Sequence, residues 1–171
     1  DAEVDNETTL SHGTHVATTI GAKNDGNDFN GFPVSVLNVR VLGADGSANN
    51  SVAKGILYAA GLDNISGTVA PTAIPIKVIN LSLGGANYNQ VMCSAVTDAR
   101  AQGLVVVAAS GNEQETEPGL INYPAACPGV ISVGATNSAG EITSYSNQNV
   151  YVDISAPGGD AEDRDGDGNG D

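Results

Sequence analysis

The chain has 171 residues, of which 40% are hydrophobic and 4% aromatic, and a formal net charge of −14, which suits one domain with an aliphatic core. Its six Lys and Arg residues are too few to neutralise a phosphate backbone, so the composition excludes nucleic acid as a partner. The longest uninterrupted apolar run, residues 104–109, is far shorter than the roughly 18 residues that cross a membrane, so it excludes a membrane-spanning segment.

Both histidines of the chain, His12 and His15, lie three residues apart in the segment LSHGTHVA (10–17). The residues that follow are rich in Gly and β-branched side chains, so a helix here would need burial to hold it. A histidine in the first turn of such a helix lies near its positive end, which favours the neutral imidazole that a general base requires. Two alternatives remain open: a structural pair of histidines, and a zinc site completed by carboxylates or by the two cysteines.

Strand-like and helix-like segments then alternate along the chain. We predict helices at 51–60 and 90–102 and strands at 34–42, 76–83, 104–110, 130–135 and 150–157. In the second helix Val91, Ala95 and Ala99 share one face, and Gly103 follows as a C-cap. The run 104–110 is apolar without alternation, which is typical of a strand covered on both faces. This pattern predicts an α/β fold with a parallel sheet, whose ligands and catalytic groups gather at the carboxyl ends of the strands.

The two cysteines and the acidic end leave alternatives open. Cys93 and Cys127 are either buried free thiols or one disulfide, which would contribute about 3–4 kcal/mol by closing a long loop. Residues 163–171 (DRDGDGNGD) match positions 1, 3, 5, 6 and 9 of an EF-hand-type calcium loop, and the same run is also compatible with a disordered acidic tail. Asp25, in the segment KNDGNDF (23–29), is a weaker calcium ligand candidate.

The segment His12–Ala17 resembles the histidine motif of the subtilisin-like serine peptidases. Five further blocks resemble that family in the same order along the chain: 39–47, 78–85, 105–113, 123–136 and 144–158. The resemblance implies a three-layer α/β subtilisin-like fold with a mostly parallel sheet flanked by helices, incomplete at both ends. Residues 1–171 would then be part of one catalytic domain, with 159–171 as its calcium loop.

The resemblance implies a role for each block. His12 would be the general base and His15 a helix-packing residue, while Asn112, otherwise an ordinary turn residue, would donate to the oxyanion. Two backbone segments would flank an extended peptide substrate, and a third would form a wall of the S1 pocket. These substrate-binding residues are Gly46, Ser47 and Ala48, then Ser82, Leu83 and Gly84, and finally Ala109, Ser110 and Gly111.

Two departures accompany the resemblance. Thr18 stands where the motif usually has Gly, which puts an extra side chain near His12. The triad aspartate and the nucleophilic serine have no counterpart: Asp1 and Asp5 follow no apolar strand, and the three serines of the last block lie in strands and turns. We therefore expect the chain alone to be inactive.

The resemblance identifies the parent protein as a secreted, monomeric serine endopeptidase with polypeptide substrates. Because secreted proteins favour disulfides, it also favours a Cys93–Cys127 bridge. Structural calcium would be held by Asp163, Asp165, Asp167, Asn169 and Asp171. The rival hypothesis is a non-catalytic relative, either a pseudo-peptidase or a calcium-binding structural domain. A nucleotide-binding α/β domain is disfavoured because no Gly-rich phosphate loop joins a strand to a helix.

Overall fold

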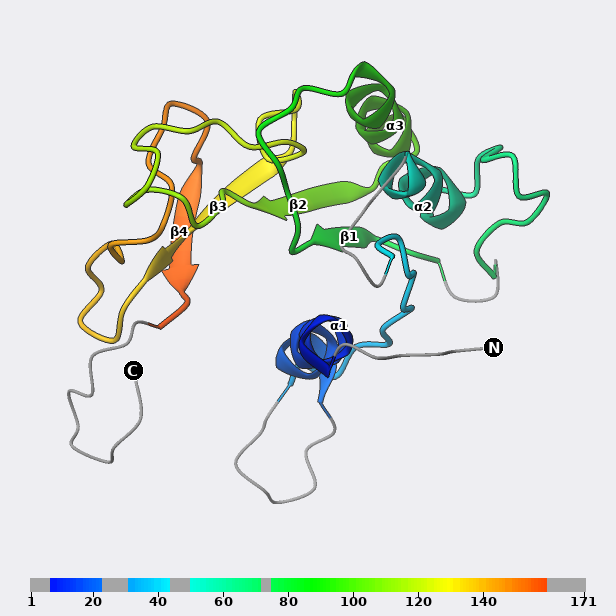
Figure 1. Cartoon of the computed structure of the whole chain (residues 1–171). Helices are drawn as coiled ribbons and strands as arrows, with labels where there is room; N and C mark the ends of the chain where they lie inside the picture. The colour runs from blue at the N-terminus through cyan, green and yellow to red at the C-terminus, as the bar shows by residue number, and fades with distance from the viewer. Residues whose placement is uncertain (1–6, 23–30, 44–49, 72–74, 160–171) are drawn as a thin grey trace. The chain divides into compact units, whose positions relative to one another are not determined.

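The computed structural model of the chain describes residues 7–22, 31–43, 50–71 and 75–159 (Figure 1). The chain divides into two compact units, residues 1–55 and residues 56–171, which we call the N-terminal and the C-terminal unit. Each unit is described by itself. Helix α2 (Ser51–Ala59) begins in the first unit and ends in the second.

Helix α1 (Glu7–Gly21) carries both histidines. His12 and His15 are exposed, so the interpretation of His15 as a packing residue is wrong for this unit. Because α1 starts at Glu7, His12 lies in its second turn, one turn further from the positive helix end than predicted. Thr18 is half-buried, and its hydroxyl donates to the Thr14 carbonyl oxygen at 2.8 Å within the helix.

The predicted strand at 34–42 is absent: residues 31–43 form no regular element, and Val34, Val36 and Leu37 are exposed. A strand exists only by pairing with another, and the described part of the N-terminal unit contains no second strand. The prediction of a strand at 34–42 is therefore wrong.

The C-terminal unit is built on a four-stranded sheet. Its strands are β1 (Val78–Leu81), β2 (Val105–Ala109), β3 (Ile131–Thr136) and β4 (Ile154–Pro157). Neighbouring strands are consecutive in the chain, and every pair is parallel (Figure 1). The predicted parallel α/β sheet is therefore confirmed. Because all four strands run the same way, their carboxyl ends meet at one edge.

Helix α3 (Gln90–Ala101) connects β1 to β2 and packs on β2. At its start, the side chain of Asn89 accepts the N–H of Met92 at 3.0 Å. At its end, Gly103 has a φ of +85°, and the N–H of Leu104 donates to the Ala99 carbonyl oxygen at 3.3 Å. This αL ending confirms the predicted glycine stop.

The buried face of α3 differs from the predicted one by part of a turn. Cys93, Val96 and Ala99 are buried, whereas Val91 is 56% exposed. The buried residues of α3 begin at Cys93, so the first turn of the helix, with Val91, lies before the part that packs. The predicted face was therefore correct at Ala95 and Ala99 and wrong at Val91.

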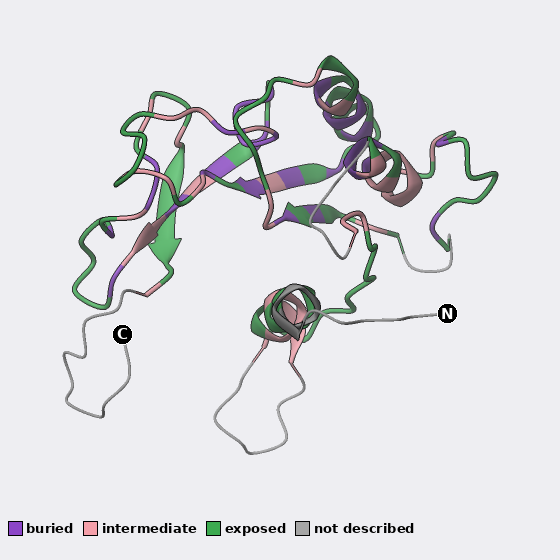
Figure 2. Cartoon of the chain, in the orientation of Figure 1, coloured by how far each residue is buried: buried purple, intermediate pink, exposed green. Residues whose placement is uncertain are grey.

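The core lies between α3 and one face of the sheet (Figure 2). Ile79, Val106 and Ala108 are buried there, while Val78 and Val105 on the opposite face are exposed. Within this unit α3 is the helix that packs on β2, so it covers one face of the strand that we predicted to be covered on both.

Cys93 and Cys127 form a disulfide with a Cα–Cα distance of 5.2 Å, and both cysteines are buried. The bridge joins α3 to the turn that precedes β3. The alternative of two free thiols is therefore excluded, and with it a zinc site that uses the cysteines as ligands.

Candidate active site

The carboxyl edge of the sheet brings two predicted substrate-binding segments to neighbouring strands. Residues Ser82, Leu83 and Gly84 follow β1, and residues Ser110, Gly111 and Asn112 follow β2. Since β1 and β2 pair in parallel, both segments leave the sheet at the same edge. This is the edge at which parallel α/β sheets collect catalytic groups.

The segment after β1 is held by residues 122–124. Gly85 and Tyr123 exchange two backbone hydrogen bonds, with N···O distances of 3.0 and 2.9 Å, in an isolated antiparallel bridge. A Cβ atom at Gly84 would lie 3.4 Å from the Tyr123 carbonyl oxygen, which is close to van der Waals contact. The Tyr123–Pro124 peptide bond is cis.

The segment after β2 is fixed by β3 and by Asn147. The N–H of Ser110 donates to the Val133 carbonyl oxygen at 2.9 Å, and the Ser110 carbonyl oxygen accepts from Nδ2 of Asn147 at 3.1 Å. The backbone N–H of Asn147 donates to the Gly111 carbonyl oxygen at 3.0 Å. Ser110 and Asn147 are both buried, so these bonds are shielded from competing water.

A carboxylate completes the network. Oε2 of Glu113 accepts three N–H groups: the backbone of Asn112 at 2.9 Å, and Nδ2 of Asn122 and of Asn147, each at 2.8 Å. The N–H of Glu113 in turn donates to Oδ1 of Asn147 at 2.7 Å. Asn122 is buried as well. A half-buried carboxylate thus receives its charge compensation from fixed amide dipoles.

Gly111 is required at the centre of this network. Its φ of +110° lies in a region that L side chains rarely adopt. A Cβ atom there would also collide with Nδ2 of Asn122, Nδ2 of Asn147 and Oε2 of Glu113. The glycine therefore provides both the turn and the space for the three polar groups.

The side chain of Asn112 is exposed, and among the described residues it has no hydrogen-bond partner. It lines a cleft of about 360 Å³ together with Ala109, Ser110 and Gly111. The opposite side of the cleft comes from the ends of β3 and β4 and from the loop between them, at Val133–Ala135, Tyr145–Ser146 and Ala156–Gly158. The structure thus brings together four predicted site residues, while Ser82, Leu83 and Gly84 do not line this cleft.

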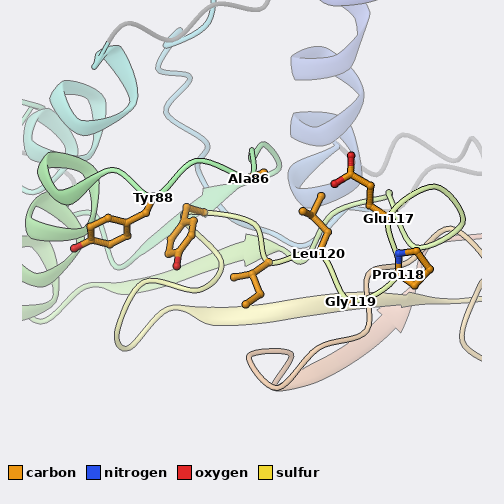
Figure 3. Close-up of a pocket in the computed structure, with 8 residues that line it drawn as sticks. Ala86, Tyr88, Glu117, Pro118, Gly119 and Leu120 are labelled. Carbon is orange, nitrogen blue, oxygen red and sulfur yellow. The ribbon is translucent and has the colours of Figure 1, made fainter.

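A second hollow of about 550 Å³ lies beside residues 86–88 and 117–123 and contains none of the predicted site residues (Figure 3). Tyr88 and Tyr123 meet there edge to face, with ring centroids 5.2 Å apart. Figure 3 shows Tyr88 and Glu117 at opposite ends of the hollow, with Leu120 between them. Two of the residues that line this hollow, Ala86 and Tyr88, follow Gly84 and Gly85 in the sequence.

Several predicted residues cannot be placed beside this edge. His12 belongs to the N-terminal unit and Asn112 to the C-terminal unit, so each is described within its own unit. Gly46, Ser47 and Ala48, Asp25, and the calcium ligand candidates Asp163, Asp165, Asp167, Asn169 and Asp171 lie outside the described residues. In the part of the chain that is described, no three His, Cys, Asp or Glu side chains form a group that could hold a metal ion.

The sequence interpretation missed Glu113, Asn122 and Asn147. Glu113 follows Asn112 directly, and the two amides lie 9 and 34 residues further along the chain. No spacing rule connects residues that far apart, so only the folded sheet reveals the network.

The described helices include none that is long and apolar enough to span a bilayer.

Comparison with known proteins points to one family. The family model described as "Subtilase family" matches residues 1–170. The chain is 41% identical over 151 residues to an "Extracellular protease" of Xanthomonas campestris pv. campestris, covering 86% of this chain and 25% of that protein. It is 40% identical over 152 residues to a "Subtilisin" of Bacillus pumilus, covering 86% of this chain and 51% of that protein. The chain thus spans between a quarter and about half of the length of these relatives.

A solved structure shows the same fold. The crystal structure of a cold adapted subtilisin-like serine proteinase matches with a TM-score of 0.68 and 33% identity, over 88% of this chain and 49% of the other. This likeness confirms the predicted subtilisin-like α/β fold. That residues 1–171 belong to one domain stays a prediction.

Proposed function

The chain belongs to the subtilase family, and we propose that it supplies the general base and the oxyanion-hole donor of a secreted serine endopeptidase. The proposal rests on one observation above all: the backbone around Asn112 is fixed by hydrogen bonds, while its side-chain amide projects unbonded into a cleft. A turn residue with no further role would not need so rigid a support.

In the proposed mechanism a serine outside this chain attacks the peptide carbonyl, and His12 accepts the serine proton. Negative charge then develops on the carbonyl oxygen. The amide of Asn112 donates to this oxyanion and so stabilises the transition state more than the bound substrate. His12 returns the proton to the leaving amine, and water releases the acyl group by the same route.

The substrate would lie extended against Ser82, Leu83 and Gly84 on one side and Gly46, Ser47 and Ala48 on the other, pairing with their backbones. Ala109, Ser110 and Gly111 would form a wall of the S1 pocket. Their position beside Asn112 on one cleft supports this arrangement. Their small side chains leave room for a sizeable substrate side chain.

Replacement of Asn112 tests the proposal in the full-length protein. Removing the corresponding donor in a subtilisin costs about 10²–10³ in kcat, and we expect a loss of that size from Asn112→Ala with KM nearly unchanged. The exposed Gln148 provides the control, because Gln148→Ala removes a similar amide from the surface. Full activity in a folded Asn112→Ala variant would overturn the proposal and favour a non-catalytic relative.

We further propose secretion and structural calcium. A disulfide in the C-terminal unit and a relative named as an extracellular protease support secretion. The calcium site would use Asp163, Asp165, Asp167, Asn169 and Asp171, with Asp25 as a candidate for a second site. The support is the alternation of acidic residues and glycines in the sequence, which suits oxygen ligands converging on one cation.

A further inference from the structure

We propose that Glu113 is a positioning residue for the oxyanion hole, which holds the backbone of Asn112 through its carboxylate. The inference rests on the proposed function, because Glu113 acts through Asn112 and does not touch the reacting atoms. Nothing in the resemblance to the family assigns Glu113 this role. It follows from the hydrogen bonds that surround one carboxylate oxygen.

The three donors to Oε2 of Glu113 come from three separate parts of the chain. The Asn112 N–H belongs to the segment after β2, Asn122 to the loop that pairs with Gly85, and Asn147 to the loop before β4. The carboxylate therefore joins three loops at the carboxyl edge of the sheet. Removing the carboxylate would break the link between the Asn112 backbone and the two loops that carry Asn122 and Asn147.

Most backbone polar groups of the turn at residues 110–113 are held by hydrogen bonds. Hydrogen bonds hold the Ser110 carbonyl oxygen, the Gly111 carbonyl oxygen, the Asn112 N–H and the Glu113 N–H. The side chain of Asn112 is the polar group of this turn that stays exposed, with no partner among the described residues. A fixed backbone with a free amide is the arrangement that preorganised oxyanion stabilisation requires.

The network also explains how a carboxylate can stand next to a site for a developing negative charge. An uncompensated carboxylate would oppose the oxyanion. Here its Oε2 accepts three N–H groups, two of them from buried amides. These donors offset the negative charge of Glu113, and its carboxylate still holds the backbone N–H of Asn112.

A double-mutant cycle in the full-length protein distinguishes positioning from a general structural role. We expect Glu113→Ala to lower kcat about 10–100-fold with little change in KM, because small misplacements of a catalytic group cost up to about 100-fold. In an Asn112→Ala background the same substitution should change kcat less than about 3-fold, since the residue it positions is gone. Glu115→Ala, which removes an exposed carboxylate two residues away, should leave both constants unchanged.

The outcomes separate the two proposals. If Asn112→Ala keeps full activity, the proposed function fails. If Asn112→Ala loses activity but Glu113→Ala does not, or if its cost is the same in both backgrounds, the positioning role alone is overturned. Should thermal unfolding show that Glu113→Ala does not fold, Glu113→Gln takes its place in the cycle. Glutamine keeps the length of the side chain but replaces the charged Oε2 atom, which accepts all three N–H groups, by a neutral amide oxygen. Because hydrogen bonds to a neutral acceptor are weaker, we expect about a 10-fold loss of kcat that vanishes in the Asn112→Ala background.

Discussion

Gly111 has the strictest requirements of any single residue that we describe at the carboxyl edge. It combines a φ of +110° with three polar neighbours that a Cβ atom would strike. A side chain at this position would displace the polar groups that hydrogen-bond to Glu113. Both the conformation and the space therefore depend on the absence of a side chain.

We expect Gly111→Ala to lower the free energy of unfolding by at least about 2 kcal/mol, from backbone strain and from collision together. Gly119 provides a matched control, because its φ is +83° and a Cβ atom there would meet nothing within 4 Å. Gly119→Ala should cost only the strain, about 1 kcal/mol. Urea unfolding measures both, and equal losses would contradict the collision.

Residue-level sequence reasoning predicts Asn112 and the small residues beside it as site residues because they form a contiguous block, and the structure places them on one cleft. It did not find Asn122 and Asn147, whose connection to Glu113 depends on how three loops meet. It also misjudged His15, which is exposed. Local motifs are visible in a sequence, whereas hydrogen bonds between distant loops exist only after folding.

Helix α3 is the best-anchored helix of the C-terminal unit in the described structure. It has an asparagine N-cap, an αL glycine ending and a disulfide to the turn before β3. The disulfide closes a loop with a sequence separation of 34 residues. Closing a loop of this length restricts the unfolded chain and so stabilises the folded state.

Replacing both cysteines by alanine should lower the free energy of unfolding by about 3–4 kcal/mol. The measurement is urea unfolding of the wild type, the Cys93→Ala/Cys127→Ala variant and the reduced wild type, and the last two should agree within about 1 kcal/mol. Ser94→Ala, at an exposed neighbour on the same helix, should have almost no effect. A double variant as stable as the oxidised wild type would show that the bridge adds nothing.

Element predictions succeeded where an element carries its own signals. Helices α2 and α3 and strands β1 to β4 all overlap the predicted segments. The prediction failed at 34–42, because a run of β-branched residues favours extended chain but cannot supply a pairing strand. For the second face of β2 the described part of the C-terminal unit supplies no covering helix, since the pattern of a strand shows what it can bury and not which element covers it.

At the scale of the whole molecule, the chain carries 20 acidic and six basic residues. Such an excess of one charge destabilises the compact state by self-repulsion, and a bound divalent cation would offset part of it. The acidic residues of 163–171 lie outside the described structure. The calcium proposal therefore depends on a stability measurement.

Chelation should lower the melting temperature of the full-length protein, and calcium should restore it. Asp165→Asn combined with Asp167→Asn should remove most of this difference, because both residues stand at ligand positions of the proposed loop. Glu115→Gln, an exposed acid elsewhere in the chain, should preserve it. Identical melting curves with chelator and with calcium would rule out a stabilising site.

We propose that this chain brings a histidine base to a serine endopeptidase, and its two histidines allow a direct test. His12 and His15 lie three residues apart on α1, and both are exposed. The measurement is kcat/KM for peptide hydrolysis by the full-length protein, with each histidine replaced by alanine in turn. We predict that His12→Ala lowers it by about 10⁴-fold or more while His15→Ala leaves it nearly unchanged. A folded His12→Ala variant that hydrolyses peptides at the wild-type rate would show that His12 is not the general base.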